Sequence, residues 1–435
     1  MYIINMENQD NMNARKAKIQ KNFLSSIRPL YYMARTVGIT PLSISNSCKI
    51  KETSLGRKLY TACLLLLVLA SSSYSLVVRV TQSDLVTTIV VNEFLMMSVG
   101  TAKAVTSMIL CLTLNRVPAR QIVQKMVKID SFLLSDPDRT YKSMFKFSAT
   151  QMVVVYIYVI LLFFCDVFVW THAVDQMGAG YLISGYPHRI VNIASVIEFC
   201  DYVLLLRSRI RILNSNLHSI LKKLEKYSCS GKLNLIDRIS SSTVNTQRIG
   251  SYTDSSKVFR QAEIPRMIGS EYEFLHKLRE LYDELCDVTD LINSMYGLLL
   301  LLELGVTTIE LTSTLYLLLA TVLQIQSVEI NVIGMFSSLM VAWFILYSFK
   351  LISITMPSHS ARSEMENTVV LVQKLLLEKQ FDRLTITELK LFSHQLMQRK
   401  VKFNAFGFLI LDYSLLFTII GGVTTYLVIA MQYKK

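Results

Sequence analysis

One face of the last apolar segment, residues 408–433, is lined by small and polar side chains. They lie three or four positions apart, between Leu, Ile, Val and Phe, at Ser414, Thr418, Gly421, Gly422, Thr425, Ile429 and Gln432. A helix with this pattern has one face that avoids lipid. Small residues and hydroxyls allow membrane helices to pack closely. They also suit a pore wall, in which one helix from each of several subunits surrounds an axis and the Gln432 carbonyls replace part of a cation's hydration shell.

A second group of chemically capable residues lies in the apolar segments further upstream. These aromatic, thioether, carboxylate, amide and hydroxyl side chains are Glu93, Met97, Asp166, Trp170, Asn192, Ser195, Glu198, Tyr316, Asn331 and Trp343. Aromatic walls with a few placed polar groups are what a small-molecule pocket needs. Trp170 and Tyr316 are equally typical of the aromatic belt at a membrane surface, and Asn192 and Ser195 of hydrogen bonds between membrane helices. Glu93 and Lys103 are about 15 Å apart along one helix, so each needs another partner.

The composition predicts an all-α membrane protein. Of the 435 residues, 52% are hydrophobic and 18% are charged, against about 25% charged in a soluble domain. The apolar residues form seven stretches near 59–79, 86–114, 147–171, 190–210, 295–323, 329–352 and 408–433. Each approaches the roughly 20 residues that cross a bilayer. We therefore expect seven transmembrane helices, and we exclude a cytosolic enzyme and a disordered chain.

The distribution of Lys and Arg predicts the orientation. Forty of the 45 lie in segments 1–58, 115–146, 207–292 and 350–407, which share one side of a seven-span protein. Positively charged loops stay in the cytoplasm, so we expect a cytoplasmic N-terminus and an extracellular C-terminus. A G-protein-coupled receptor has the opposite topology, and its Asp-Arg-Tyr and Asn-Pro-x-x-Tyr motifs are missing. The net charge of +13 then reflects a basic face near anionic lipid, and no nucleic-acid partner is expected.

The connections differ between the two sides. The external ones are short, and the middle one runs from about 172 to 189. Apolar residues at helical spacing extend the fourth span and lead into the fifth. We expect spans one to four at 59–210, cytoplasmic helical extensions at 211–292 around a disordered loop at 228–270, and spans five and six at 293–352. Residues 353–407 are expected to form cytoplasmic anchor helices, and 408–435 a pore-lining seventh helix.

The end of the chain resembles a known family. Thr425-Tyr426, five apolar residues and Gln432-Tyr433 are similar to the Thr-Tyr-(five apolar)-Gln-Phe signature of insect gustatory receptors, with Tyr433 in place of the usual Phe. KVKFNAFGFLILDYSLLF and GGVTTYLVIAMQ resemble that family's last helix, and LCDVTDLINSMYGLLLLL resembles its approach to the fifth span. IRPLYYMARTVGITPL resembles its membrane-entering segment, placed here near 23–46 within a cytoplasmic N-terminus of residues 1–58. The chain is identified as a member of this family, which is related to the insect odorant receptors.

The resemblance implies a ligand-gated, non-selective cation channel in the cell membrane of a sensory neuron dendrite. It implies a homotetramer, or a heteromer with other gustatory receptors, that passes monovalent and divalent cations. The last helix of each subunit would line the pore, with pore or gate residues at Thr418, Gly422, Thr425, Tyr426, Ile429, Gln432 and Tyr433. The partner would be a small-molecule tastant in a pocket among spans two to six, for which the ten residues named above are the candidates. No cofactor is implied.

The resemblance also bears on the ligand. Members gated by other sugars carry an acidic residue where this chain has Leu427. Fructose-gated members place a pocket Trp at a position similar to Trp343, but an indole ring stacks on a sugar or on a planar alkaloid alike. The last helix is most similar to the group that includes bitter and plant-compound receptors. We expect a bitter plant secondary metabolite, with fructose or another nutrient as the alternative.

Other functional classes receive less support. The six histidines are scattered, and no HExxH, GxSxG or phosphate-binding glycine loop is present. The seven cysteines show no metal-ligand spacing. We therefore expect no catalytic residue and no metal site. A membrane transporter is the competing class, although a transporter has no need of a Gly/Thr/Gln face in its terminal helix.

Overall fold

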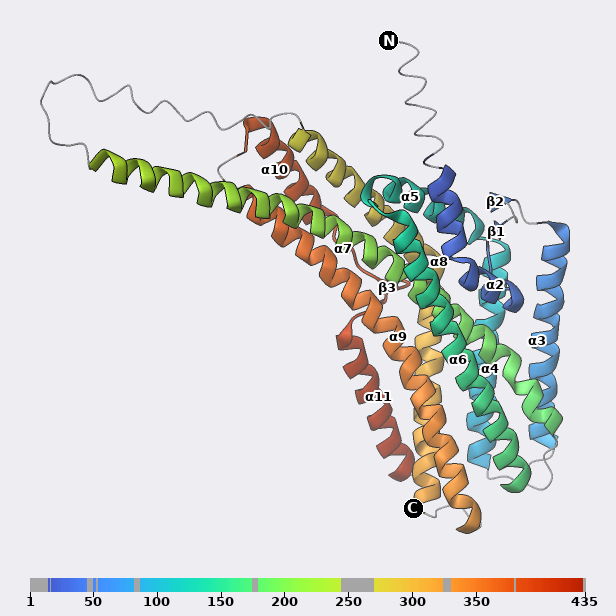
Figure 1. The fold of residues 1–435 in the computed structure, drawn as a ribbon. Helices are drawn as coiled ribbons and strands as arrows, with labels where there is room; N and C mark the ends of the chain where they lie inside the picture. The colour runs from blue at the N-terminus through green and yellow to red at the C-terminus, as the bar shows by residue number, and fades with distance from the viewer. Residues whose placement is uncertain are drawn as a thin grey trace, which may run out of the picture. The chain divides into compact units, whose positions relative to one another are not determined.

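The chain is almost entirely helical where its structure is described. The computed structural model describes residue 15 and residues 17–44, 50–51, 54–81, 87–173, 179–243, 270–323, 330–378 and 381–432. Its helices are α2 (Arg28–Val37), α3 (Leu55–Thr81), α4 (Thr87–Leu112), α5 (Arg116–Leu133), α6 (Pro137–Ala173), α7 (Ala179–Thr243), α8 (Ser270–Val322), α9 (Ile330–Leu377), α10 (Arg383–Gln398) and α11 (Tyr413–Gln432) (Figure 1). Two short antiparallel hairpins pair β1 (Ser43–Ile44) with β2 (Ile50–Lys51) and β3 (Asn404–Ala405) with β4 (Leu409–Ile410).

Each predicted span falls on a helix. Among the described residues, 6 helices are long and apolar enough to cross a membrane, namely α3, α4, α6, α8, α9 and α11. The predicted fourth span lies on α7, which is not among them and carries Glu198 and Asp201 in that stretch. A total of seven spans therefore stays a prediction. The basic stretch 115–146 contains the helix α5, which we had expected only as a connection.

Helix α7 is longer than predicted at both ends. It continues to Thr243, so the disordered loop expected at 228–270 is wrong for residues 228–243, and the rest of that loop lies outside the described residues. It begins at Ala179 and passes through Pro187, which shortens the external connection expected at 172–189. Extending an existing helix costs far less free energy than starting one, and hydropathy alone misses this.

The chain divides into two compact units. The larger unit comprises residues 1–209, 287–362 and 402–435. Within it α3 packs against α4 and α2 packs against α6. Helix α2 ends at Val37 and is capped by Gly38, whose φ of 80° allows its N–H to reach the Ala34 and Arg35 carbonyls. This unit contains all of the candidate site residues described below.

The smaller unit comprises residues 210–286 and 363–401. Arg279 Nε donates to Glu388 Oε1 at 2.6 Å, joining α8 to α10. Asp382 caps α10 by accepting a hydrogen bond from Thr385 N at 3.1 Å. Hydrogen bonds from Thr385 hold the pKa of the Asp382 carboxyl below its ordinary value. Leu389, Phe392 and Leu396 of α10 are buried, as expected for an amphipathic helix.

A hairpin of the larger unit precedes the last helix. In β3–β4, Ala405 pairs with Leu409, and the turn between them places Phe406 and Gly407 at φ of 54° and 78°. Asn404 Oδ1 stabilises the turn by accepting from Gly407 N at 2.7 Å. The expectation that the anchor helices reach 407 and the last helix starts at 408 is therefore wrong, because these positive φ angles are incompatible with a right-handed helix. The last helix begins at Tyr413.

Candidate functional site

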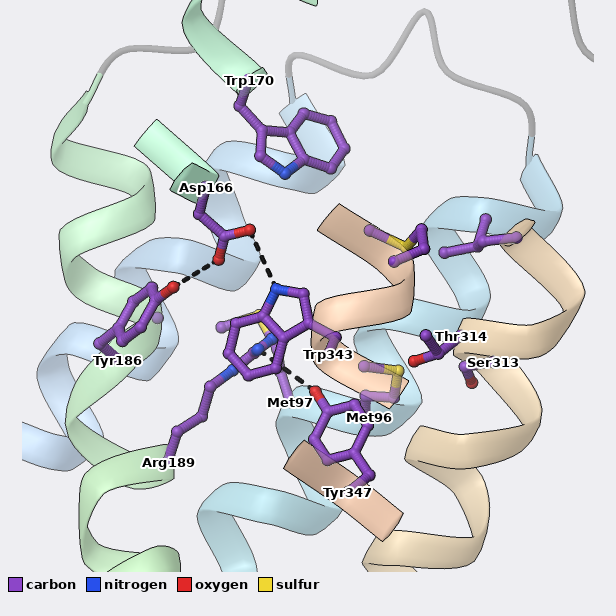
Figure 2. Close-up of a pocket in the computed structure, with 13 residues that line it drawn as sticks. Met96, Met97, Asp166, Trp170, Tyr186, Arg189, Ser313, Thr314, Trp343 and Tyr347 are labelled. Atoms are coloured by element: carbon purple, nitrogen blue, oxygen red, sulfur yellow. Dashed lines mark hydrogen bonds between the residues drawn. The ribbon is translucent and has the colours of Figure 1, made fainter. Parts of the chain in front are cut away.

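The larger unit contains a small pocket between α4, α6, α7, α8 and α9. Figure 2 shows its side chains, which converge from these helices on a central space. Aromatic, thioether and hydroxyl groups dominate, with one carboxylate and one guanidinium among them. The lining residues are Met96, Met97, Asp166, Trp170, Gly185, Tyr186, Arg189, Ser313, Thr314, Leu317, Met340, Trp343 and Tyr347.

Asp166 holds two aromatic side chains of this pocket in place. Its Oδ1 accepts a hydrogen bond from Trp343 Nε1 at 3.0 Å, and its Oδ2 accepts one from the Tyr186 hydroxyl. The three residues come from α6, α9 and α7 (Figure 2). Buried carboxylates are costly unless they are hydrogen-bonded. This arrangement therefore fixes the relative positions of three helices around the pocket.

Arg189 lies against the aromatic side chains of the pocket (Figure 2). Its guanidinium carbon is 4.5 Å from the centroid of the Trp343 ring and 5.9 Å from that of Tyr186. Its Nη1 donates a long hydrogen bond of 3.4 Å to Tyr347 Oη. The rings of Trp343 and Tyr347 stack at a centroid distance of 5.5 Å. The pocket thus combines flat apolar surfaces with a cation, a carboxylate and hydroxyl groups.

The free volume of the pocket is about 70 Å³. That is roughly the share of two water molecules and well below the roughly 300 Å³ at which ligand pockets usually start. A ligand larger than a few atoms can enter only if lining side chains move. Met96, Met97 and Met340 are the most adaptable of them, since the unbranched thioether changes rotamer easily.

A cluster of four buried charges lies beside this pocket. Glu303 of α8 forms ion pairs with Lys103 of α4 and with Lys350 of α9, at 2.7 Å in each case. Glu310, seven residues further along α8, lies 2.8 Å from Lys350. The Lys350 Nζ is also 5.4 Å from the centroid of the Tyr347 ring, which lines the pocket. Two positive and two negative charges compensate one another, which is how charged groups are tolerated away from water.

The last helix makes few contacts with the rest of the described chain. It buries only Leu415, Ile419 and Val423, which form one row at intervals of four residues. All seven residues of the small and polar face, Ser414, Thr418, Gly421, Gly422, Thr425, Ile429 and Gln432, are exposed. The Thr425 hydroxyl donates to the Gly421 carbonyl at 2.8 Å within the helix. Packing of this face against another described helix of the same chain is therefore the wrong interpretation.

A profile of the 7tm Chemosensory receptor family matches residues 27–435. This is nearly the whole chain. The chain belongs to the 7tm Chemosensory receptor family. The resemblance to insect gustatory receptors at its C-terminus is thereby confirmed. The prediction that the chain is a multi-pass membrane protein of a receptor family is confirmed as well.

Two relatives from Drosophila melanogaster agree with this assignment. Gustatory receptor 28b is 29% identical over 168 residues, which are 38% of this chain and 35% of that protein. Gustatory receptor 68a is 28% identical over 197 residues, 43% of this chain and 47% of the relative. The matches thus span less than half the length of either relative.

Two solved structures have a similar fold. The insect olfactory receptor OR5 from Machilis hrabei has a TM-score of 0.61 at 11% identity, over 94% of this chain and 97% of that one. The same receptor in complex with eugenol has a TM-score of 0.60 at 12% identity, over 94% and 98%. The two proteins therefore share a fold despite their low sequence identity.

The receptor's pocket includes four of the ten predicted ligand-binding residues. Met97, Asp166, Trp170 and Trp343 line it. The predicted residues Asn192, Ser195, Glu198 and Tyr316 are buried but do not line it. Glu93 and Asn331 lie on α4 and α9, and their side chains are outside the described residues.

The polar residues outside the pocket make other contacts. Asn192 Nδ2 donates to the Gly100 carbonyl at 3.0 Å, which is the interhelical hydrogen bond that the sequence left as an alternative. The backbone carbonyl of Asn192 also accepts a hydrogen bond from Lys103 Nζ at 3.2 Å. Glu303 and Asn192 are therefore the partners that Lys103 needs on other helices.

Sequence reasoning missed Tyr186, Arg189 and Tyr347 as pocket residues. Tyr186 and Arg189 were assigned to an external connection, whereas α7 carries both into the pocket. Tyr347 lies one helical turn after Trp343 on α9, and this spacing is the signal that could have identified it. Lys350 was counted with the cytoplasmic charges, but it is buried in the charge cluster.

The predicted pore and gate residues all lie on or directly after α11. Thr418, Gly422, Thr425, Tyr426, Ile429 and Gln432 are exposed on that helix. Added Cβ atoms at Gly421 and Gly422 would meet nothing within 4 Å. Tyr433 lies outside the described residues. The role of the seven predicted pore and gate residues in conduction stays a prediction.

Proposed function

We propose that this chain is a gustatory receptor that forms a ligand-gated, non-selective cation channel. It is opened by a small extracellular tastant, for which a bitter plant secondary metabolite is the preferred class and fructose or another nutrient the alternative. It acts in the cell membrane of sensory dendrites with its N-terminus cytoplasmic and its C-terminus extracellular. Four subunits, identical or shared with other gustatory receptors, surround one pore.

The observation that carries the channel proposal is the exposure of α11. A terminal membrane helix that buries only Leu415, Ile419 and Val423 leaves most of its surface for lipid and for other subunits. Its exposed small and polar face includes Thr418, Thr425 and Gln432 at the same orientation. Hydroxyl and amide oxygens are suited to replace the hydration shell of a cation. One such helix from each subunit would enclose a path of this kind.

The pocket supports the ligand part of the proposal. Aromatic surfaces from Tyr186, Trp343 and Tyr347 combine there with the polar groups of Asp166 and Arg189, as small-molecule sites require. A receptor with this fold has been solved in complex with eugenol, and we infer by likeness that this chain also binds a small molecule. Entry of the ligand would displace side chains from the compact arrangement. The ligand would then bind the rearranged pocket more tightly than the compact one. Gating requires such a difference in affinity between two conformations.

The direct test is whole-cell current from cells that express this chain alone, with G-protein signalling blocked. Bitter plant compounds, fructose and other sugars are applied while surface expression is verified. A rapid cation current that survives the block supports an autonomous channel, and the active compound identifies the ligand class. Saturable uptake of a compound without unitary current steps would favour a transporter instead.

A further inference from the structure

Arg189 is held in the pocket by aromatic rings rather than by a carboxylate. Its guanidinium faces the Trp343 ring and the Tyr347 hydroxyl (Figure 2). Within the described part of the chain, the 3.4 Å contact with Tyr347 is the one hydrogen bond that it makes, and it forms no ion pair there. A guanidinium has five N–H donors in a planar fork. Most of the hydrogen-bonding capacity of this group is therefore uncommitted.

The nearby carboxylates make their hydrogen bonds and ion pairs with other described residues than Arg189. Glu303 and Glu310 are engaged by Lys103 and Lys350 at 2.7 to 2.8 Å. The two oxygens of Asp166 accept hydrogen bonds from Trp343 and Tyr186. A partly desolvated cation with a single long hydrogen bond is costly. The pocket is thus incomplete in hydrogen-bond acceptors on the Arg189 side.

A planar carboxylate on a ligand would supply the hydrogen-bond acceptors that Arg189 lacks. Two parallel N–H···O bonds from a guanidinium to a carboxylate are the strongest geometry available to this side chain. The surrounding rings of Tyr186, Trp343 and Tyr347 suit an aromatic group, and the lining methionines can move to admit it. An amine would meet the fixed positive charge of Arg189. Asp166 is the one carboxylate among the described lining residues, and both of its oxygens already accept hydrogen bonds.

We infer that Arg189 is the ligand-recognition residue of this pocket and that the ligand class it selects is a small aromatic carboxylate. The inference rests on the proposed function in one respect only, namely that this pocket is the tastant site. It narrows the plant-metabolite class to acids and excludes the basic alkaloids.

Three probes with one carbon skeleton test the ligand class: 3-phenylpropanoate, its methyl ester and 3-phenylpropylamine. Their binding to the full-length receptor in lipid nanodiscs is measured by thermal stabilisation over a concentration series. The carboxylate should bind about 10- to 100-fold more tightly than the ester, because the ester gives up the charge-assisted hydrogen bonds. The amine should bind more weakly still. Equal or tighter binding of the amine, or no binding of any of the three, overturns the inference.

Substitution of Arg189 gives the second test. Arg189→Gln should weaken carboxylate binding about 10- to 100-fold and abolish the preference over the ester, while Arg189→Lys should retain part of that preference. The matched control is Arg211→Gln, because Arg211 is 62% exposed and pairs with Glu364 in the smaller unit. Unchanged selectivity in Arg189→Gln overturns the inference. If that variant does not fold, Arg189→Lys and the wild-type probe series decide.

Currents recorded with the same three probes separate this inference from the proposed function. Selective binding of the carboxylate without any current would leave the inference intact and contradict the channel proposal. A current evoked by the amine and not by the carboxylate would support the channel and overturn the inference.

Discussion

Glu303 Oε1 of α8 lies 2.7 Å from Lys350 Nζ of α9, although both side chains are buried. The other Glu303 oxygen is engaged by Lys103 of α4, so one carboxylate joins three helices. Lys350 lies three residues after Tyr347, which lines the pocket. The charge cluster therefore supports the helices that form the candidate ligand site.

Removing the charge of Glu303 should destabilise the receptor strongly. Glu303→Gln leaves Lys103 and Lys350 buried with only Glu310 as a counter-charge. An uncompensated buried charge typically costs about 3–5 kcal/mol. We expect a clear fall in the thermal unfolding temperature of the detergent-purified protein.

A second substitution distinguishes charge balance from lost packing. In the double variant Glu303→Gln with Lys103→Met, only the pair of Lys350 and Glu310 remains, so a large part of the stability should return. Asp287→Asn is the control, because its partly exposed partner Lys125, at 2.9 Å, should contribute only about 0–1 kcal/mol. A double variant no more stable than Glu303→Gln would contradict this explanation.

The bond between Asp166 and Trp343 should affect ligand response rather than conduction. Trp343→Phe keeps an aromatic ring but removes the indole N–H that donates to Asp166 at 3.0 Å. A buried hydrogen bond of this kind contributes about 0.5–1.5 kcal/mol, or more when it involves a charge. We expect a shift of roughly 3- to 30-fold in the half-activating ligand concentration. Unitary conductance is the internal control, and a change in conductance with no change in the concentration response would place Trp343 outside the ligand site.

The sequence was sufficient to predict most of the membrane helices but not their lateral contacts. Long apolar runs identify membrane helices directly, since a bilayer tolerates little else. The small and polar face of α11 was also predictable, because its residues share one helical orientation, but its exposure was not. Which helices meet is set by packing between segments distant in sequence. Lys103 and Glu303 are 200 positions apart, so no local sequence pattern indicates that they form a pair.

Arg189 illustrates the same difficulty at the site. A charged residue near a proline is typical of a loop, and hydropathy placed it outside the membrane. The structure continues α7 through Pro187 and turns Arg189 toward Trp343. Only the partners of a charged side chain, which the sequence does not reveal, decide whether it is external or buried.

The contact between Gly297 and the β3–β4 hairpin should be sensitive to a single methyl group. A Cβ at Gly297 of α8 would lie 3.1 Å from Phe406 N and 3.4 Å from Phe406 Cα. Backbone atoms cannot move aside like a flexible side chain, so Gly297→Ala should destabilise the protein by about 1–3 kcal/mol. Gly305→Ala on the same helix is the matched control, since nothing lies within 4 Å of its added Cβ. It should be neutral or stabilise the protein by up to about 1 kcal/mol, and equal effects of the two substitutions would refute the contact.

Gln432 should influence which ions pass if the exposed face of α11 lines a pore. Gln432→Ala removes an amide oxygen that can coordinate a cation, so we expect a severalfold change in the permeability ratio of divalent to monovalent cations, at unchanged surface expression. Ile420→Ala is the control, because Ile420 is 59% exposed and lies about 120° from Gln432 around the same helix. Reversal potentials measured under bi-ionic conditions report the ratio. A shift in Ile420→Ala with none in Gln432→Ala would assign the pore to the other face of α11.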